Sequence, residues 1–422
     1  MIAKDLANTI VDPKAYADPS RIDAAFTAIR RDTPFAQAEP DDYDRFWVAS
    51  KHADLLDIER QATIFSNGAG PTNLGPSASH AMVKAMTGEA NMIRTLVSVD
   101  GDEHKALRAL TFPAFTPRSI RQYEDMVRGI AREYVAEMLN RAPQIDFASE
   151  IAFHYPLRVI MTLLGVPRQD EDYLLTLTQQ LFGGADPEMN RAGKTVDGAE
   201  ATNNVVQVMI DLENYFEEVT RRYRAAPDDH AINSLVANAR IDGAYLNRRQ
   251  LMGYYIIAAT AGHDTTANTT ASAMWALAER PELFAKVKTD PDAMVPFIEE
   301  TIRWATPVKT FMRTAVADGT VNGKAVAKGD WLLLSYHSAN RDEDVFDNPF
   351  EFRIDRMPNK QVAFGSGPHV CLGQHLARFE MRLFWEALLP RIATVELAGQ
   401  PTTLESCFVV GPKSVPLRFS VQ

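Results

Sequence analysis

Apolar residues recur along most of the chain at the spacing of an α-helix. After Pro19-Ser20, a first apolar set repeats at intervals of three and four residues: Ile22, Ala25, Phe26 and Ile29. From about residue 117 to residue 292 the helical pattern is nearly continuous, with amphipathic stretches at 120–139 and 157–164. Helices are therefore expected to form most of the molecule.

Short apolar segments near both ends of the chain predict a smaller amount of β-structure. The segments are Phe46-Trp47-Val48, Thr320-Val321, Trp331 to Leu334, and the alternating Val415, Leu417 and Phe419. Asn322-Gly323 follows the second segment and is typical of a tight hairpin. The sequence thus predicts a mainly α fold with a minor β region contributed by both ends. No repeat or Gly/Ser-rich linker divides it, so residues 1–422 are expected to form a single domain.

Composition narrows the class of protein. Hydrophobic residues make up 46% and charged residues 23%, as in packed globular proteins. The formal net charge of -11 opposes binding to nucleic acid or to anionic lipid surfaces. Residues 1–12 contain no apolar run of signal-peptide or anchor length, so a cytoplasmic protein is expected.

The chain has two cysteines, Cys371 and Cys407, too few for a structural zinc site built on thiolates. A disulfide between them is disfavoured in a reducing cytoplasm. Cys371 stands in a Gly-rich segment, Phe364 to Gly373, and the apolar spacing that follows predicts that it lies at the start of a helix. The helix dipole and loop amides would lower the pKa of this thiol and favour metal ligation. The alternative is a structural cysteine beside a turn.

A polar cluster interrupts the long apolar helix that is predicted from Asn247, with Gln250 as its capping-box partner, to Arg280. The cluster, Ala261 to Thr266, contains a glycine and adjacent acid and alcohol side chains. We expect the Thr265 hydroxyl to bond the Ala261 carbonyl and open the helix locally, which would make room for a small molecule. A plain kink with solvated polar residues is the alternative.

Together these segments resemble the cytochrome P450 superfamily of haem-thiolate monooxygenases. Phe364 to Gly373 is similar to its haem signature, Phe-Gly-x-Gly-x-His-x-Cys-x-Gly, and Ala261 to Thr266 to its oxygen-binding groove. The motifs occur in the expected order along nearly the whole chain, and within the superfamily the bacterial terpineol-hydroxylating type is the most similar. The resemblance implies a helix-rich triangular prism with small sheets, and haem b (iron protoporphyrin IX) as cofactor.

The same resemblance implies roles for individual residues. Cys371 would be the iron ligand, with Phe364, Gly365 and Gly373 shaping the haem loop. Asp264 and Thr265 would relay protons to dioxygen, whereas His263 falls at a variable position and is assigned no role. The haem propionates would be held by a cationic set: His104, Arg108, Arg313 and His369. Glu300, Arg303 and Arg356 would have a structural role and lock the haem loop.

Six residues are expected by position to face the substrate: Ile257, Ala261, Val308, Phe311, Phe408 and Val409. All are apolar or small, which suits a compact terpenoid or aromatic hydrocarbon, although each could equally be ordinary core. The expected reaction is a hydroxylation that uses O2 and two electrons from an iron-sulfur ferredoxin and its reductase. Basic residues near the thiolate side, Arg118, Arg121 and Arg378, are candidates for docking this donor to a monomeric enzyme.

Two other functions remain open from the sequence. A peroxide-using haem-thiolate enzyme would need no proton relay, so the adjacent Asp264 and Thr265 argue against it. A non-enzymatic haem-binding sensor would be expected to carry an output segment, and the chain shows none.

Overall fold

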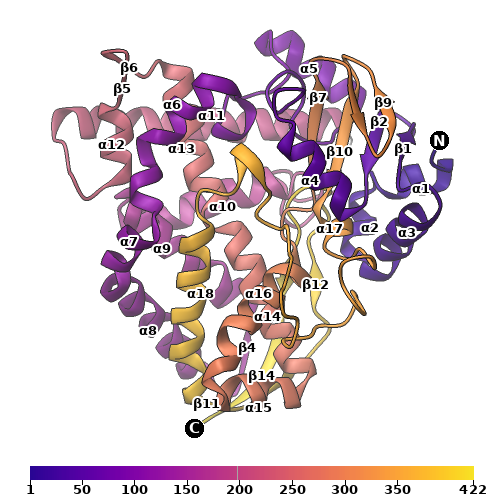
Figure 1. The fold of residues 1–422 in the computed structure, drawn as a ribbon. Helices are drawn as coiled ribbons and strands as arrows, with labels where there is room; N and C mark the ends of the chain where they lie inside the picture. Colours follow the sequence, from indigo (N-terminus) through magenta and orange to yellow (C-terminus); the bar gives the residue numbers. More distant parts are fainter. Residues whose placement is uncertain (197) are drawn as a thin grey trace.

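The computed structural model describes residues 1–196 and 198–422. In Figure 1 the helices form the larger part of a roughly triangular outline, and most strands gather at the amino-terminal side and at the narrow end near the C-terminus, while one short hairpin at residues 240–245 lies apart at the upper left. This arrangement confirms the predicted mainly α fold with a minor β region.

The α-helices are α1 Lys4–Thr9, α2 Pro13–Ala17, α3 Pro19–Asp32, α4 His52–Arg60, α5 Ser77–Thr87, α6 Gly101–Thr111, α7 Pro117–Ile120, α8 Glu124–Asn140, α9 His154–Leu164, α10 Glu171–Phe182, α11 Gly198–Ala225, α12 Ile232–Asn238, α13 Arg248–Ala261, α14 Asp264–Glu279, α15 Pro281–Thr289, α16 Met294–Ala305, α17 Tyr336–Ala339 and α18 Gln374–Leu388. The strands are β1 Phe35–Ala38, β2 Phe46–Ala49, β3 Phe65–Ser66, β4 Gln144–Asp146, β5 Arg240–Ile241, β6 Ala244–Tyr245, β7 Thr310–Ala315, β8 Gly319–Val321, β9 Lys324–Val326, β10 Trp331–Ser335, β11 Ile392–Leu397, β12 Thr402–Thr403, β13 Pro412–Ser414 and β14 Pro416–Val421.

Both ends of the chain contribute to the sheets, as the sequence predicted. The main sheet has the order β1-β2-β10-β7-β3, in which β10 runs parallel to β2 and antiparallel to β7. A second sheet has the order β11-β14-β4 and lies at the narrow end of the molecule (Figure 1). The main sheet therefore places residues near position 48 beside residues near position 333.

Several local predictions are confirmed. The four apolar residues that predicted a helix after Pro19-Ser20 are all buried in α3. Asn322 and Gly323 join β8 to β9 with φ of 49° and 69°, and two positive φ values are what a tight hairpin turn of this twist requires. The Asn247–Gln250 capping box is present at the start of α13.

The long helix that was predicted from Asn247 to Arg280 is divided at the polar cluster. α13 ends at Ala261, Gly262 and His263 are not helical, and α14 begins at Asp264. A side chain at position 262 would lie 2.6 Å from Ile160 of α9, so glycine allows the close approach of the two elements. The helix thus opens where the sequence predicted it would.

Within the described residues, no helix is long and apolar enough to cross a membrane.

Candidate functional site

The Gly-rich loop before α18 carries Cys371, which is half-buried. Gly365 and Gly367 have φ of 68° and 67°, a region that favours glycine. A side chain at position 367 would approach the Glu59 carbonyl oxygen to 2.6 Å, so this glycine also permits the loop to pack against α4. The Cys371 amide donates to the Phe364 carbonyl over 2.8 Å and closes the loop.

Cys371 stands close to the start of the helix, because α18 begins at Gln374 with Gly373 as its N-cap. The Gly373 and Gln374 amides lower the pKa of the Cys371 thiol, as expected, and so does the Arg108 guanidinium. Burial raises this pKa and outweighs the groups that lower it.

His104, Arg108 and His369 meet beside Cys371. The rings of His104 and His369 lie with centroids 4.0 Å apart, and an Arg108 Nη2 donates to the Val370 carbonyl over 2.8 Å. Burial, followed by the neighbouring His369 and Arg108, lowers the pKa of His104 to about 4. The structure therefore brings together three of the four predicted propionate partners from α6 and the loop.

Arg313, the fourth predicted partner, is buried on β7 with Nη2 3.6 Å from Glu59 Oε1. Glu59 Oε1 also accepts from the Tyr336 hydroxyl over 2.6 Å. Burial raises the pKa of Glu59, although Arg313 and Tyr336 lower it. The sequence reasoning missed Glu59, because nothing near it in the chain indicates that α4 supports the loop and Arg313.

Asp100 is a second residue that the sequence reasoning left without a role. Its Oδ1 lies 3.2 Å from His369 Nε2, and its Oδ2 accepts from Ser66 Oγ over 2.6 Å and from the Gly68 amide over 2.8 Å. Asp100 therefore orients the His369 ring. The only available signal was its position four residues before His104.

These residues fit a haem with a thiolate ligand. His104 Nε2 is buried and has no hydrogen-bond partner in the described part of the chain, so it is free to donate to a carboxylate. A Cβ at Gly373 would meet nothing within 4 Å, so this glycine, two residues after Cys371, leaves open space for a flat group. In the described residues, no cluster of three or more His, Cys, Asp or Glu side chains could hold a bare metal ion.

The interruption between α13 and α14 carries the predicted acid and alcohol. Thr265 Oγ1 donates to the Ala261 carbonyl over 3.2 Å, the bond that its spacing predicted. Asp264 is 6% exposed, its Oδ2 has no hydrogen-bond partner in the described residues, and burial raises its pKa. Here the chain holds a buried carboxyl group next to a hydroxyl.

The predicted substrate residues fall into two groups. Val308 and Val409 pair in a β-bridge, and the rings of Phe311 and Phe408 lie 5.2 Å apart in an edge-to-face arrangement. Ile257 and Ala261 lie one turn apart on α13. Val409 is 2% exposed and Ala261 is exposed, so the set includes both core and accessible positions.

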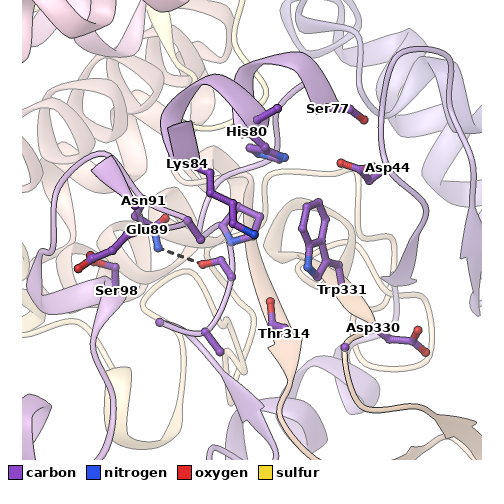
Figure 2. A pocket seen from close by; sticks show the side chains of 18 of the residues that line it. Asp44, Ser77, His80, Lys84, Glu89, Asn91, Ser98, Thr314, Asp330 and Trp331 are labelled. Atoms are coloured by element: carbon purple, nitrogen blue, oxygen red, sulfur yellow. Dashed lines mark hydrogen bonds between the residues drawn. The ribbon is translucent and has the colours of Figure 1, made fainter. Parts of the chain in front are cut away.

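A groove of about 1080 Å³ lies elsewhere, between α5, residues 68–71 and Trp331. Figure 2 shows His80 and Lys84 of α5 on one side of it, with Trp331 and Thr314 opposite. Its lining contains neither Cys371 nor any of the six predicted substrate residues. Neighbouring residues of a strand face opposite sides, which is why Thr314 lines the groove whereas Arg313 faces Glu59.

Glu300, Arg303 and Arg356 form a buried ion-pair network. Glu300 and Arg303 are fully buried, and Arg303 Nη2 and Nε donate to the two carboxylate oxygens, each over 2.7 Å. Arg356 Nε donates to Glu300 Oε1 over 3.0 Å. Arg303 also donates to the carbonyls of Asn340, Pro349 and Glu351. Glu300 and Arg303 have the spacing of an ordinary surface pair on a helix, but in the structure they hold three chain segments together.

The predicted docking arginines differ in their surroundings. Arg118 and Arg121 are exposed on the segment that begins with α7, which packs against α18. Arg378 instead pairs with Glu299 over 2.5 Å and lies over the Phe364 ring at 4.4 Å. Its guanidinium is engaged in holding the haem loop, so only the first two are free to meet a partner.

Comparisons with known proteins agree with this site. The family description Cytochrome P450 matches residues 76–418. The chain is 42% identical over 421 residues to Cytochrome P450-terp of a Pseudomonas species, covering 99% of this chain and 98% of that protein. It is 32% identical to a steroid C26-monooxygenase of Mycolicibacterium smegmatis, covering 87% of this chain and 82% of that protein.

Solved structures show the same relationship. The structure of CYP108D1 from Novosphingobium aromaticivorans superposes with a TM-score of 0.91 and 38% identity, covering 100% of both chains. Cytochrome P450 CYP268A2 of Mycobacterium marinum, in complex with pseudoionone, gives a TM-score of 0.85 and 29% identity, covering 95% of both chains.

Proposed function

The chain belongs to the cytochrome P450 family and is a P450 monooxygenase, and we propose that it hydroxylates a compact terpenoid or aromatic hydrocarbon with electrons from a ferredoxin. The proposal treats residues 1–422 as one catalytic domain. The observation that carries it is the junction around Cys371, where a Gly-rich loop, His104, His369 and Arg108 meet the requirements of a haem-thiolate site.

The residues around the loop would hold the cofactor. Cys371 would ligate the iron, and His104, Arg108, Arg313 and His369 would bind the propionates. When bound, haem supplies an iron at which dioxygen is reduced and one oxygen atom is transferred to a C–H bond while the other leaves as water. Asp100 and Glu59 act behind the binding residues, since they fix the His369 ring and the Arg313 guanidinium.

Proton supply would come from the opened helix. Burial raises the pKa of Asp264. This carboxyl group therefore holds a proton more readily than an exposed aspartate does. The Thr265 hydroxyl lies next along the chain and can pass a hydrogen bond into the space left by the break. A peroxide-using enzyme needs no such pair, so this arrangement favours the use of dioxygen.

Apolar surface is proposed to select the substrate. Phe311, Phe408 and Val308 form a cluster that contributes aromatic and branched surface with no charged atom. Such a lining binds a small hydrocarbon mainly by burying it. The 42% identity to P450-terp over nearly the whole chain supports a terpenoid among the possible substrates.

A ferredoxin is the proposed electron donor, because the chain shows no flavin or nicotinamide motif. The exposed Arg118 and Arg121 provide positive charge near α18 for an acidic partner. Reversing both charges should slow reduction by a ferredoxin and weaken the dependence of that rate on salt. An unchanged rate and salt dependence would exclude this surface as the docking site.

The substrate class is tested by titrating the haem-loaded protein with a panel of terpenes, aromatic hydrocarbons and long-chain fatty acids, while the low-spin to high-spin shift of the iron is followed. We expect saturable shifts with compact hydrocarbons. The substitution Phe408→Ala should weaken their binding about tenfold, ~1.4 kcal/mol, whereas Val316→Ala, at a surface position that is 38% exposed, should not. A shift with fatty acids alone, or equal binding by both variants, would overturn the proposal.

A further inference from the structure

His263 occupies the break between α13 and α14 and is fully buried, yet the proposed function gives it no task. Its Nδ1 lies 2.9 Å from the Ala259 carbonyl oxygen. Its Nε2 lies 3.0 Å from Thr178 Oγ1 of α10 and 3.3 Å from Asp264 Oδ2. The ring therefore contacts both Thr178, which lies 85 residues earlier in the chain, and the Asp264 carboxyl group that is proposed to deliver protons.

These contacts determine where a proton can reside. A carbonyl oxygen only accepts hydrogen bonds, so Nδ1 must carry hydrogen to satisfy Ala259. Nε2 is then the one nitrogen of this ring that can gain or lose a proton, and it faces Asp264. Within the described residues, Asp264 Oδ2 has no other hydrogen-bond partner. One proton between these two atoms would satisfy both of them.

The Thr178 hydroxyl can adapt to either position of that proton. Its oxygen lies 3.0 Å from both the Leu175 carbonyl and His263 Nε2. When Nε2 carries hydrogen, the hydroxyl donates to Leu175 and accepts from the ring. When Nε2 is bare, the hydroxyl can turn and donate to it. Neither state leaves a buried donor without an acceptor on this side of the ring.

We propose that His263 is a positioning residue that shares one proton with Asp264 and gives it to the carboxyl group for delivery through Thr265. In that step the N–H bond at Nε2 breaks as an O–H bond forms at Asp264 Oδ2, and imidazolium and carboxylate become neutral imidazole and carboxylic acid. This inference rests on the proposed function, because it assumes that Asp264 supplies protons to the reaction.

The groups that surround the pair bear on where its proton lies. From α9, Ile160 faces the break at Gly262, and from α10 Thr178 faces the ring; neither side chain is charged. From α18, the buried Glu380 interacts with Thr266, two residues beyond Asp264, and burial raises its pKa strongly. Burial also raises the pKa of Asp264, while His263 and Thr178 lower it. Glu380 is therefore the other acid whose substitution must be compared.

The first test is an NMR spectrum of haem-loaded protein labelled with ¹⁵N-histidine, recorded in the diamagnetic carbon monoxide form. The His263 signals are assigned by their loss in His263→Gln. We expect the ¹⁵N shift of Nε2 to change in Asp264→Asn but not in Glu380→Gln. If the Nε2 shift is the same in wild type and Asp264→Asn, no proton is shared and the inference is wrong.

The second test measures product and hydrogen peroxide per electron across pH. His263→Asn keeps an amide in the place of Nδ1 but has no nitrogen in the place of Nε2, and we expect it to slow product formation about tenfold, less than the ~10²-fold typical of losing a general acid itself. His263→Gln should restore part of the rate but not the pH profile. Ser272→Ala, a buried polar deletion in the same helix, serves as the control and should match the wild type.

The two proposals fail separately. If Asp264→Asn and Thr265→Ala both leave product per electron unchanged, the proton relay of the proposed function is wrong. If those variants divert electrons to peroxide but His263→Asn does not, the relay stands and the role of His263 is refuted.

Discussion

Removing the charge of Glu300 should destabilise the protein more than any surface substitution. This carboxylate is fully buried and accepts hydrogen bonds from Arg303, Arg356, the Arg353 amide and Asn359. In Glu300→Gln, one oxygen becomes an amide that donates toward guanidinium groups, which are themselves donors. Arg303 is fully buried and Arg356 nearly so, and both would then lack a counter-charge.

The magnitude follows from that geometry. Breaking a buried pair by removing one partner typically costs about 3–5 kcal/mol. With an unfolding entropy of about 2.1 cal/mol/K per residue, a chain of this length should lose about 3–6 °C in melting temperature. The haem loop should also loosen, because Asn359 of the segment before the loop bonds to the same carboxylate.

Thermal unfolding of the haem-loaded protein is followed at a fixed scan rate by circular dichroism and by haem absorbance. Arg353→Ala is the matched control, since Arg353 pairs through its side chain with the exposed Asp355 and its loss should hardly change the melting temperature. If Glu300→Gln melts at the temperature of that control, the network does not stabilise the fold as reasoned.

Three further outcomes follow from the structure. Thr265→Ala should keep haem and substrate binding but divert electrons into free peroxide, which is measured by product formed per electron consumed; an unchanged yield would refute the relay. Burial raises the pKa of Asp23, but Arg341 and His337 lower it more and hold it below its usual range. The Asp23 carboxylate should therefore stabilise the fold above about pH 4 and lose that effect as pH falls. The difference in urea midpoint between wild type and Asp23→Asn should shrink on acidification, and a constant difference would contradict this sign. Arg108→Ala should speed transfer of haem to apomyoglobin several-fold more than Lys105→Ala, whose side chain pairs with Asp102 at the surface, and equal rates would exclude Arg108 as a haem contact.

Local spacing was sufficient to predict much of the site. The Asn247–Gln250 capping box, the Thr265 bond to Ala261 and the turn at Asn322-Gly323 each depend on residues within four positions, and all three are present. The haem loop could be placed for the same reason, because two positive φ angles at Gly365 and Gly367 are a local requirement.

Contacts between distant segments could not be predicted in this way. Glu59 supports the loop from α4, Asp100 orients His369 across the fold, and His263 reaches Thr178 on α10. Each of these side chains is ordinary in its own sequence neighbourhood and gains a role only through packing. The amides beside Cys371 lower its pKa as predicted, but burial raises it more, and the burial of this side chain could not be predicted from its neighbours in the sequence.

The central claim is that the sulfur of Cys371 ligates a haem iron. It is tested most directly by the carbon monoxide difference spectrum of the reduced, haem-loaded protein, compared with that of Cys371→Ser and of Cys407→Ser as control. We expect the band typical of thiolate-ligated haem in the wild type and in Cys407→Ser, and its loss in Cys371→Ser. An unchanged band in Cys371→Ser, or its absence from the wild type, would contradict the account.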